Sequence, residues 1–228
     1  MKIAILGAMS EEIAPLLEHF GEYEKVDYAA NEFYLTSFAN HDLVLAYSKI
    51  GKVNSALTAS VMFEKFGCEA MLFTGVAGAL EEGLNIGDLL FATQTAQHDL
   101  DISVFGHPKG FVPGGSVFCK TDERLNLIAQ NTAAQLGINL KSGVIASGDI
   151  FVCDETSKQN IKTEFNAAAT EMEGASVAVV CDALKKPFFL LRAISDTASG
   201  GAEIDFDEFV QSSAKTSAKF IISMLNQI

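Results

Sequence analysis

Apolar and polar positions form two patterns in this chain, and the patterns follow one another. Short apolar or alternating runs predict strands at residues 3–7, 32–36, 43–47, 70–74, 89–93, 141–147 and 187–194. Apolar residues spaced three or four apart predict helices at 10–19, 53–66, 121–136, 157–164, 174–184 and 206–225. Strands that alternate with helices, several of them apolar throughout, indicate an α/β fold with a largely buried sheet.

Residues typical of helix caps and turns mark the ends of the predicted elements. Ser10 is expected to cap the first helix, and Thr121 or Asp122 the third. Gly75-Val76-Ala77-Gly78 follows a strand and is expected to form a tight turn, where glycine also allows a ligand to approach the backbone. Residues 99–120 are expected to be irregular. Since no linker or repeat interrupts the pattern, residues 1–228 are predicted to form one domain.

Charge and cysteine content exclude several classes of protein. The net charge of −13 argues against binding to nucleic acid or to anionic lipid. The four cysteines, at 68, 119, 153 and 181, form no Cys-x-x-Cys pair and do not cluster with the histidines. This argues against a zinc site and favours free thiols in the cytoplasm. The chain has no signal-peptide pattern and no apolar run long enough to span a membrane.

Carboxylates occur where elements meet, in Ser10-Glu11-Glu12, Glu171-Met172-Glu173 and Ser195-Asp196. Buried charge at such positions is costly unless it has a partner or a chemical role, so the three clusters suggest acid–base chemistry on a small polar substrate. Other interpretations stay open. The glutamates could stabilise a helix N-terminus, Arg192 and Asp196 could form a structural ion pair, and Phe151 could be a core aromatic residue.

Six motifs resemble one family in order and spacing, over essentially the whole chain. They are Gly7-Ala8-Met9-Ser10-Glu11-Glu12, Gly51-Lys52-Val53-Asn54, Thr74-Gly75-Val76-Ala77-Gly78, Ser147-Gly148-Asp149, Glu171-Met172-Glu173 and Arg192-Ala193-Ile194-Ser195-Asp196. The sequence is similar to the bacterial 5′-methylthioadenosine/S-adenosylhomocysteine nucleosidases of the purine nucleoside and uridine phosphorylase superfamily. The resemblance implies a three-layer α/β/α sandwich around a mixed, partly barrel-like sheet. It also implies a homodimer and no metal or organic cofactor.

The resemblance assigns catalytic roles that cleavage of a ribosyl C1′–N9 bond requires. Asp196 matches the general acid that protonates adenine N7, which we expect burial to keep protonated, and Ser195 helps to hold it. Glu12 matches the residue that activates water. Glu173 matches the residue that binds the ribose hydroxyls, and Arg192 is expected to orient Glu173, Glu12 or the water.

The resemblance also implies the substrate contacts. Phe151 matches the base-stacking residue, the Val152 backbone would bind the adenine edge, and Met172 packs under the sugar. The other matches are Phe206 in a segment that closes over the site, and Ile102, Phe105 and Pro113, which a partner subunit contributes to the 5′ pocket. Val76 departs from the family, where serine is frequent and helps to hold the ribose or the water.

The expected reaction is hydrolysis of methylthioadenosine, S-adenosylhomocysteine and 5′-deoxyadenosine, as in methionine salvage. Similar enzymes cleave 6-amino-6-deoxyfutalosine in menaquinone biosynthesis, which is an alternative substrate. A purine nucleoside phosphorylase and a non-catalytic nucleoside-binding module are the rival functions. A phosphorylase needs a cationic phosphate pocket, whereas this chain has only two arginines, Arg124 and Arg192, and places acids in the motifs.

Overall fold

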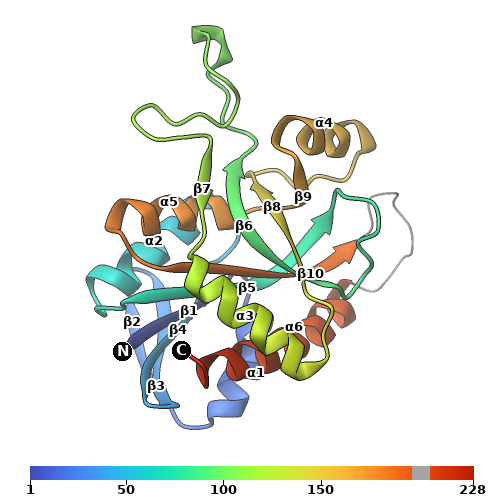
Figure 1. The fold of residues 1–228 in the computed structure, drawn as a ribbon. Coiled ribbons are helices and arrows are strands. Elements are labelled where there is room, and N and C mark those ends of the chain that lie inside the picture. The colour runs from blue at the N-terminus through green and yellow to red at the C-terminus, as the bar shows by residue number, and fades with distance from the viewer. Residues whose placement is uncertain (197–205) are drawn as a thin grey trace.

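A mixed sheet forms the centre of the fold in the computed structural model, which describes residues 1–196 and 206–228, with side chains in the last helix from Phe209 onward (Figure 1). The strands are β1 (Lys2–Gly7), β2 (Glu24–Tyr28), β3 (Asn31–Phe38), β4 (His41–Tyr47), β5 (Ala70–Ala79), β6 (Leu89–Gln97), β7 (Phe118–Lys120), β8 (Lys141–Ser147), β9 (Ala167–Glu171) and β10 (Phe188–Asp196). The helices are α1 (Ser10–Phe20), α2 (Lys52–Glu64), the 3₁₀ helix η1 (Ser103–Phe105), α3 (Glu123–Leu136), α4 (Glu155–Phe165), α5 (Gly174–Leu184) and α6 (Phe206–Leu225).

The sheet closes partly on itself. Its strand order is β10-β6-β8-β9-β5-β1-β4-β3-β2, and a further pairing between β10 and β5 joins the end of this path back to its middle. Strands β10, β6, β8, β9 and β5 therefore form a closed ring, and β1 to β4 extend from it as an open sheet. Parallel pairs such as β1–β5 and antiparallel pairs such as β5–β9 both occur, which confirms the mixed, partly barrel-like sheet.

Helices cover both faces of the sheet, as the apolar runs predict. On β1, Ile3 and Ile5 pack into the core under α1, α3 and α6, whereas Ala4 and Leu6 pack into the core under α2 and α5. Figure 1 shows the two helical layers on opposite sides of the sheet. Because successive strand residues point to opposite faces, a strand that is buried on both must be apolar at every position.

Most predicted elements are confirmed, but two local predictions are wrong and three strands were not predicted. Gly75–Gly78 is not a turn, because β5 continues through it to Ala79 and pairs with β10 and β9. Met9, not Ser10, is the residue that caps α1. The strands not predicted are β2, which is largely exposed, β9, whose alanines carry no strand signal, and the three-residue β7.

The segment between β6 and β7 extends away from the layers (Figure 1). It contains η1 and is otherwise irregular from Asp99 to Val117, as expected. The short strand β7, which follows it, was expected to be irregular as well. No helix in the described ranges is long and apolar enough to cross a membrane.

Candidate active site

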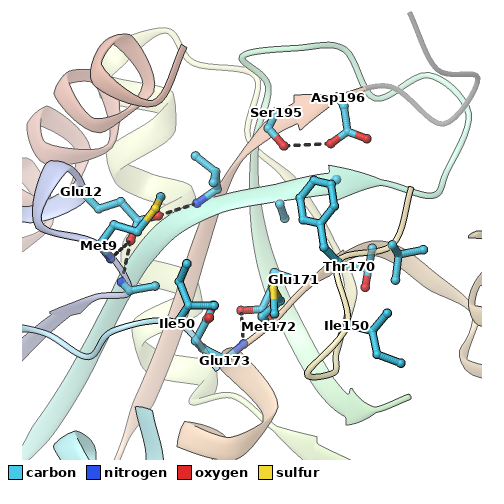
Figure 2. Close-up of a pocket in the computed structure, with 16 residues that line it drawn as sticks. Met9, Glu12, Ile50, Ile150, Thr170, Glu171, Met172, Glu173, Ser195 and Asp196 are labelled. Carbon is cyan, nitrogen blue, oxygen red and sulfur yellow. Dashed lines mark hydrogen bonds between the residues drawn. The ribbon is translucent and has the colours of Figure 1, made fainter. Parts of the chain in front are cut away.

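One pocket gathers the carboxyl ends of several strands. The segments after β1 and β8, the last residues of β5, the β9–α5 junction and the end of β10 all contribute side chains (Figure 2). The lining residues are Ala8, Met9, Glu12, Ile50, Val76, Ala77, Gly78, Ile150, Phe151, Val152, Thr170, Glu171, Met172, Glu173, Ser195 and Asp196. The three acidic motifs of the sequence therefore meet in one place.

Glu12 lies in the first turn of α1 and is 3% exposed. Its Oε2 accepts the backbone N–H groups of Ala8 (2.6 Å) and Met9 (3.0 Å), and its Oε1 accepts that of Val76 (3.2 Å). Burial raises the pKa of Glu12, although Arg192 and these N–H groups act against the rise. A fixed carboxylate with a raised pKa is suited to take a proton from water near neutral pH.

Arg192 pairs with Glu171, a partner that the sequence did not indicate. Its Nη2 donates to Glu171 Oε2 at 2.6 Å, and these side chains are 1% and 3% exposed. The guanidinium also lies over the Phe73 ring, 4.2 Å from its centroid. The proposed Arg192–Asp196 ion pair is therefore absent, and Arg192 acts on Glu12 and Glu173 through its charge rather than through a salt bridge.

Glu171 is the structural centre of the β9–α5 junction, a role the sequence did not assign to it. Besides Arg192, it accepts the N–H groups of Glu173 (3.1 Å) and Gly174 (2.8 Å), and the Ser147 hydroxyl also bonds to it. The helix-terminus interpretation of this acidic motif is thus correct for Glu171. The sequence signal for this role was the position of Glu171, which lies two residues before Glu173 at the start of a predicted helix.

Glu173 is held by a different set of contacts and remains directed at the pocket. Its Oε1 accepts the N–H of Gly51, at 2.8 Å, from the turn before α2. Burial and the neighbouring charge of Glu171 raise the pKa of Glu173 to about 7, against the opposing effect of Arg192. A carboxyl group poised between its two forms near neutral pH can accept hydrogen bonds from vicinal hydroxyls.

Asp196 ends β10 at the other side of the pocket from Glu12 (Figure 2). Its Oδ1 accepts the Ser195 hydroxyl at 2.9 Å, and its Oδ2 lies 3.2 Å from the Nζ of Lys158. The side chain is 43% exposed. The expected burial of Asp196 is therefore not found, and a cation that the sequence analysis did not identify contacts it instead.

Two glycines of β5 make room for the site's charged groups, and one of them, Gly78, also lines the pocket. A methyl group on Gly75 would lie 2.8 Å from Glu12 Oε1 and 3.0 Å from Arg192 Nη1, and one on Gly78 would lie 2.9 Å from Asp196 Oδ1. A bulge in β10 after Ile194 places Asp196 opposite Gly78, which has no side chain. Bulges commonly direct a side chain in this way beside active sites.

The other pocket residues form an apolar wall and floor. Phe151 is 72% exposed and lines the pocket, so it is not a core residue and its ring is free to stack on a base. Val76, Val152 and Met172 also line the pocket. The hydroxyl of Thr170 is buried there and has no hydrogen-bond partner among the described atoms.

Several predicted residues lie elsewhere. Ile102, Phe105 and Pro113 lie in the projecting β6–β7 segment and do not line this chain's own pocket. Phe206 begins α6, but its side chain lies outside the described residues. Three further pocket residues, Met9, Ile50 and Ile150, were not predicted from the sequence, although Met9 lies in the first of the six motifs. Among the described residues, no three His, Cys, Asp or Glu side chains are grouped to hold a metal ion.

Proteins of known family and structure resemble this chain over its whole length. The family model of the phosphorylase superfamily matches residues 2–226. The chain belongs to this superfamily. This chain is 62% identical to an aminodeoxyfutalosine nucleosidase of Campylobacter jejuni, and the match covers all of both chains. A crystal structure of a C. jejuni 5′-methylthioadenosine/S-adenosyl homocysteine nucleosidase, 61% identical, superposes over all of both chains with a TM-score of 0.98. A Staphylococcus carnosus nucleosidase for methylthioadenosine and S-adenosylhomocysteine is 39% identical over 99% of this chain and 100% of its own.

We predict that Gly75→Ala lowers kcat by about 100-fold, because the added methyl group displaces Glu12 and Arg192, which their own hydrogen bonds hold in place. The measurement is the rate of base release from a nucleoside, with circular dichroism to verify folding. Gly115→Ala is the matched control, since its methyl group meets nothing closer than 3.5 Å. Wild-type kcat in Gly75→Ala would show that this glycine does not make space for the site.

Proposed function

We propose that this protein hydrolyses the N-glycosidic bond of 5′-substituted adenosines. The C1′–N9 bond breaks and its electron pair leaves with the purine, which takes a proton at N7 from Asp196. Water attacks C1′ and gives its proton to Glu12, while Glu173 binds the ribose hydroxyls and favours the developing positive charge on the sugar. The products are adenine and the 5-substituted ribose.

The observation that carries this proposal is the sign of the charge around the pocket. Four carboxylates line it, from Glu12, Glu171, Glu173 and Asp196, and no lysine or arginine is among the described lining residues. Arg192 is buried and engaged by Glu171. A phosphate dianion would be repelled here, whereas neutral water would not. The pocket thus favours hydrolysis over the phosphorolysis of the rival interpretation.

The relatives support two groups of substrates. The relatives from Campylobacter jejuni carry both the aminodeoxyfutalosine name and the methylthioadenosine/S-adenosylhomocysteine name, at 62% and 61% identity. We infer that the protein releases adenine from 6-amino-6-deoxyfutalosine, methylthioadenosine, S-adenosylhomocysteine and 5′-deoxyadenosine, which differ only beyond C5′. All four cysteines are free thiols, which supports a place in the cytoplasm, and the family match to residues 2–226 supports one domain.

Exposed apolar residues support a homodimer. Ile50, Val53 and Leu57 lie exposed at the start of α2, and Val104 and Phe105 lie exposed in η1. An ion pair of 2.5 Å between Lys52 and Asp99 ties the start of α2 to the segment that leads to η1. Exposed apolar groups of this kind mark interaction sites. We infer that a second copy docks on these residues, and that Phe105 of one copy contributes to the 5′ end of the pocket of the other.

We expect adenine release from methylthioadenosine, S-adenosylhomocysteine and aminodeoxyfutalosine to proceed at the same rate with and without phosphate, because water is the nucleophile. Chromatography of adenine and of the sugar product measures this. The values of kcat/KM then rank the substrates. A rate that requires phosphate and yields a sugar 1-phosphate would make the protein a phosphorylase. Tight binding of the nucleosides without turnover would make it a binding module.

Asp196→Asn should fold normally and bind substrate, but should lose about 10²–10⁴-fold in kcat, because an amide cannot protonate N7. Single-turnover adenine release and isothermal titration calorimetry measure the two effects. Asp182→Asn, an exposed substitution at the end of α5, is the control. If Asp196→Asn turned over near the wild-type rate, Asp196 would not be the acid.

Phe105→Ala should raise the KM for 5′-alkylthio substrates by about tenfold or more, since burying a phenyl ring contributes roughly 1.5–3 kcal/mol. Cleavage of 5′-deoxyadenosine, which lacks the 5′ group, should change little. Leu127→Ala on the exposed side of α3 controls for loss of surface apolar area. Sedimentation analysis of the same samples tests the dimer. An unchanged KM for every substrate would exclude a shared pocket.

A further inference from the structure

Lys158 is a buried cation that contacts the carboxylate of Asp196. Its Nζ lies 3.2 Å from Asp196 Oδ2, and its side chain is 7% exposed, whereas that of Asp196 is 43% exposed. A buried ammonium group is costly without an anionic partner. The lysine therefore directs its charge from inside the protein toward the rim of the pocket where N7 of a bound base would lie.

The chain holds Lys158 in place through the helix that follows the base-stacking segment. Helix α4 begins three residues after Val152, and the carboxylate of Asp154 caps it by accepting the N–H of Ser157 at 2.8 Å. The same helix packs against β8 and β9. Lys158 lies within this helix, and Phe151 lies in the short segment that leads into it.

The pocket that Asp196 lines has charged groups on several sides. Glu12 lies beyond β5, Glu171 and Glu173 lie at the β9–α5 junction, and Arg192 lies on β10 but is bound to Glu171. Among the described side chains, no lysine or arginine other than Lys158 has its nitrogen within 4 Å of the Asp196 carboxylate. Lys158 is consequently the cation with the strongest direct influence on this acid.

We propose that Lys158 is a positioning residue that controls when Asp196 carries its proton. Its ammonium group faces the Asp196 carboxyl group from inside the protein, 3.2 Å from Oδ2. Asp196 takes a proton from solvent, passes it to N7, and the ammonium group stabilises the carboxylate that remains. The proposal rests on the general-acid role of Asp196 in the proposed function.

The proposal predicts the direction in which the pH dependence changes when Lys158 loses its charge. A cation near a carboxylate favours its ionised form, so the acid loses its proton at a lower pH when Lys158 is present. Removing the charge should move the alkaline limb of the kcat/KM profile to higher pH. The expected shift is about one pH unit, at the lower end of the usual effect of a close opposite charge because Asp196 is partly exposed to water.

The test compares pH profiles of kcat/KM for methylthioadenosine in three variants. Lys158→Met and Lys158→Gln both remove the charge, and glutamine keeps an N–H donor, so either alone suffices if the other fails to fold. Lys158→Arg keeps the charge and should keep the wild-type limb. Lys162→Met, one turn further along α4, is the matched control and should leave the profile unchanged.

An alkaline limb that stays in place in the charge-removing variants overturns the proposal, whatever their rates, because a merely structural lysine changes rate without changing the profile. A limb that moves to lower pH also overturns it. Failure of the proposed function is seen separately, as phosphate-dependent release or as an active Asp196→Asn. If release ignores phosphate and Asp196→Asn is inactive, an unmoved limb refutes only the role of Lys158.

Discussion

The buried ion pair between Arg192 and Glu171 is the interaction on which the site depends. It joins strand β10 to the β9–α5 junction across the closed part of the sheet, and both side chains are almost fully buried. Removing one partner of such a pair typically costs about 3–5 kcal/mol, because the other charge is left without compensation. Glu171 also accepts the N–H groups of Glu173 and Gly174. The pair therefore sets the direction of Glu173 as well as the start of α5.

The carboxylates of the pocket can lie close together because each has a different environment. Glu171 is compensated by Arg192, Glu12 by three backbone N–H groups, and Asp196 by Lys158 and Ser195. Glu173 has the least compensation, and its pKa rises to about 7. Groups of one chemical type thus have different electrostatic environments, and such differences allow acid and base roles to be separated within one site.

The sequence predicts the fold better than it predicts the contacts within the site. Continuous apolar runs identify β1, β5 and β10, because strands covered on both faces are apolar over most of their length. The alanines of β9 carry no such signal, and the strand exists because its neighbours β5 and β8 pair with it. Sequence motifs bring Glu12, Glu173 and Asp196 to one pocket, but they do not determine that Arg192 binds Glu171. Lys158 lies in an unremarkable polar helix, and only the packing of α4 brings it to Asp196.

The choice of nucleophile in this pocket follows from where its cations are. Both cations near the site, Arg192 and Lys158, are bound to acids, so neither offers a free positive charge to an entering anion. The acids that remain oriented to the pocket make its potential negative. A negative pocket disfavours phosphate and stabilises the positive charge that develops on the ribose as the glycosidic bond breaks. The same ion pairs that allow these acids to be buried therefore also select water as the attacking group.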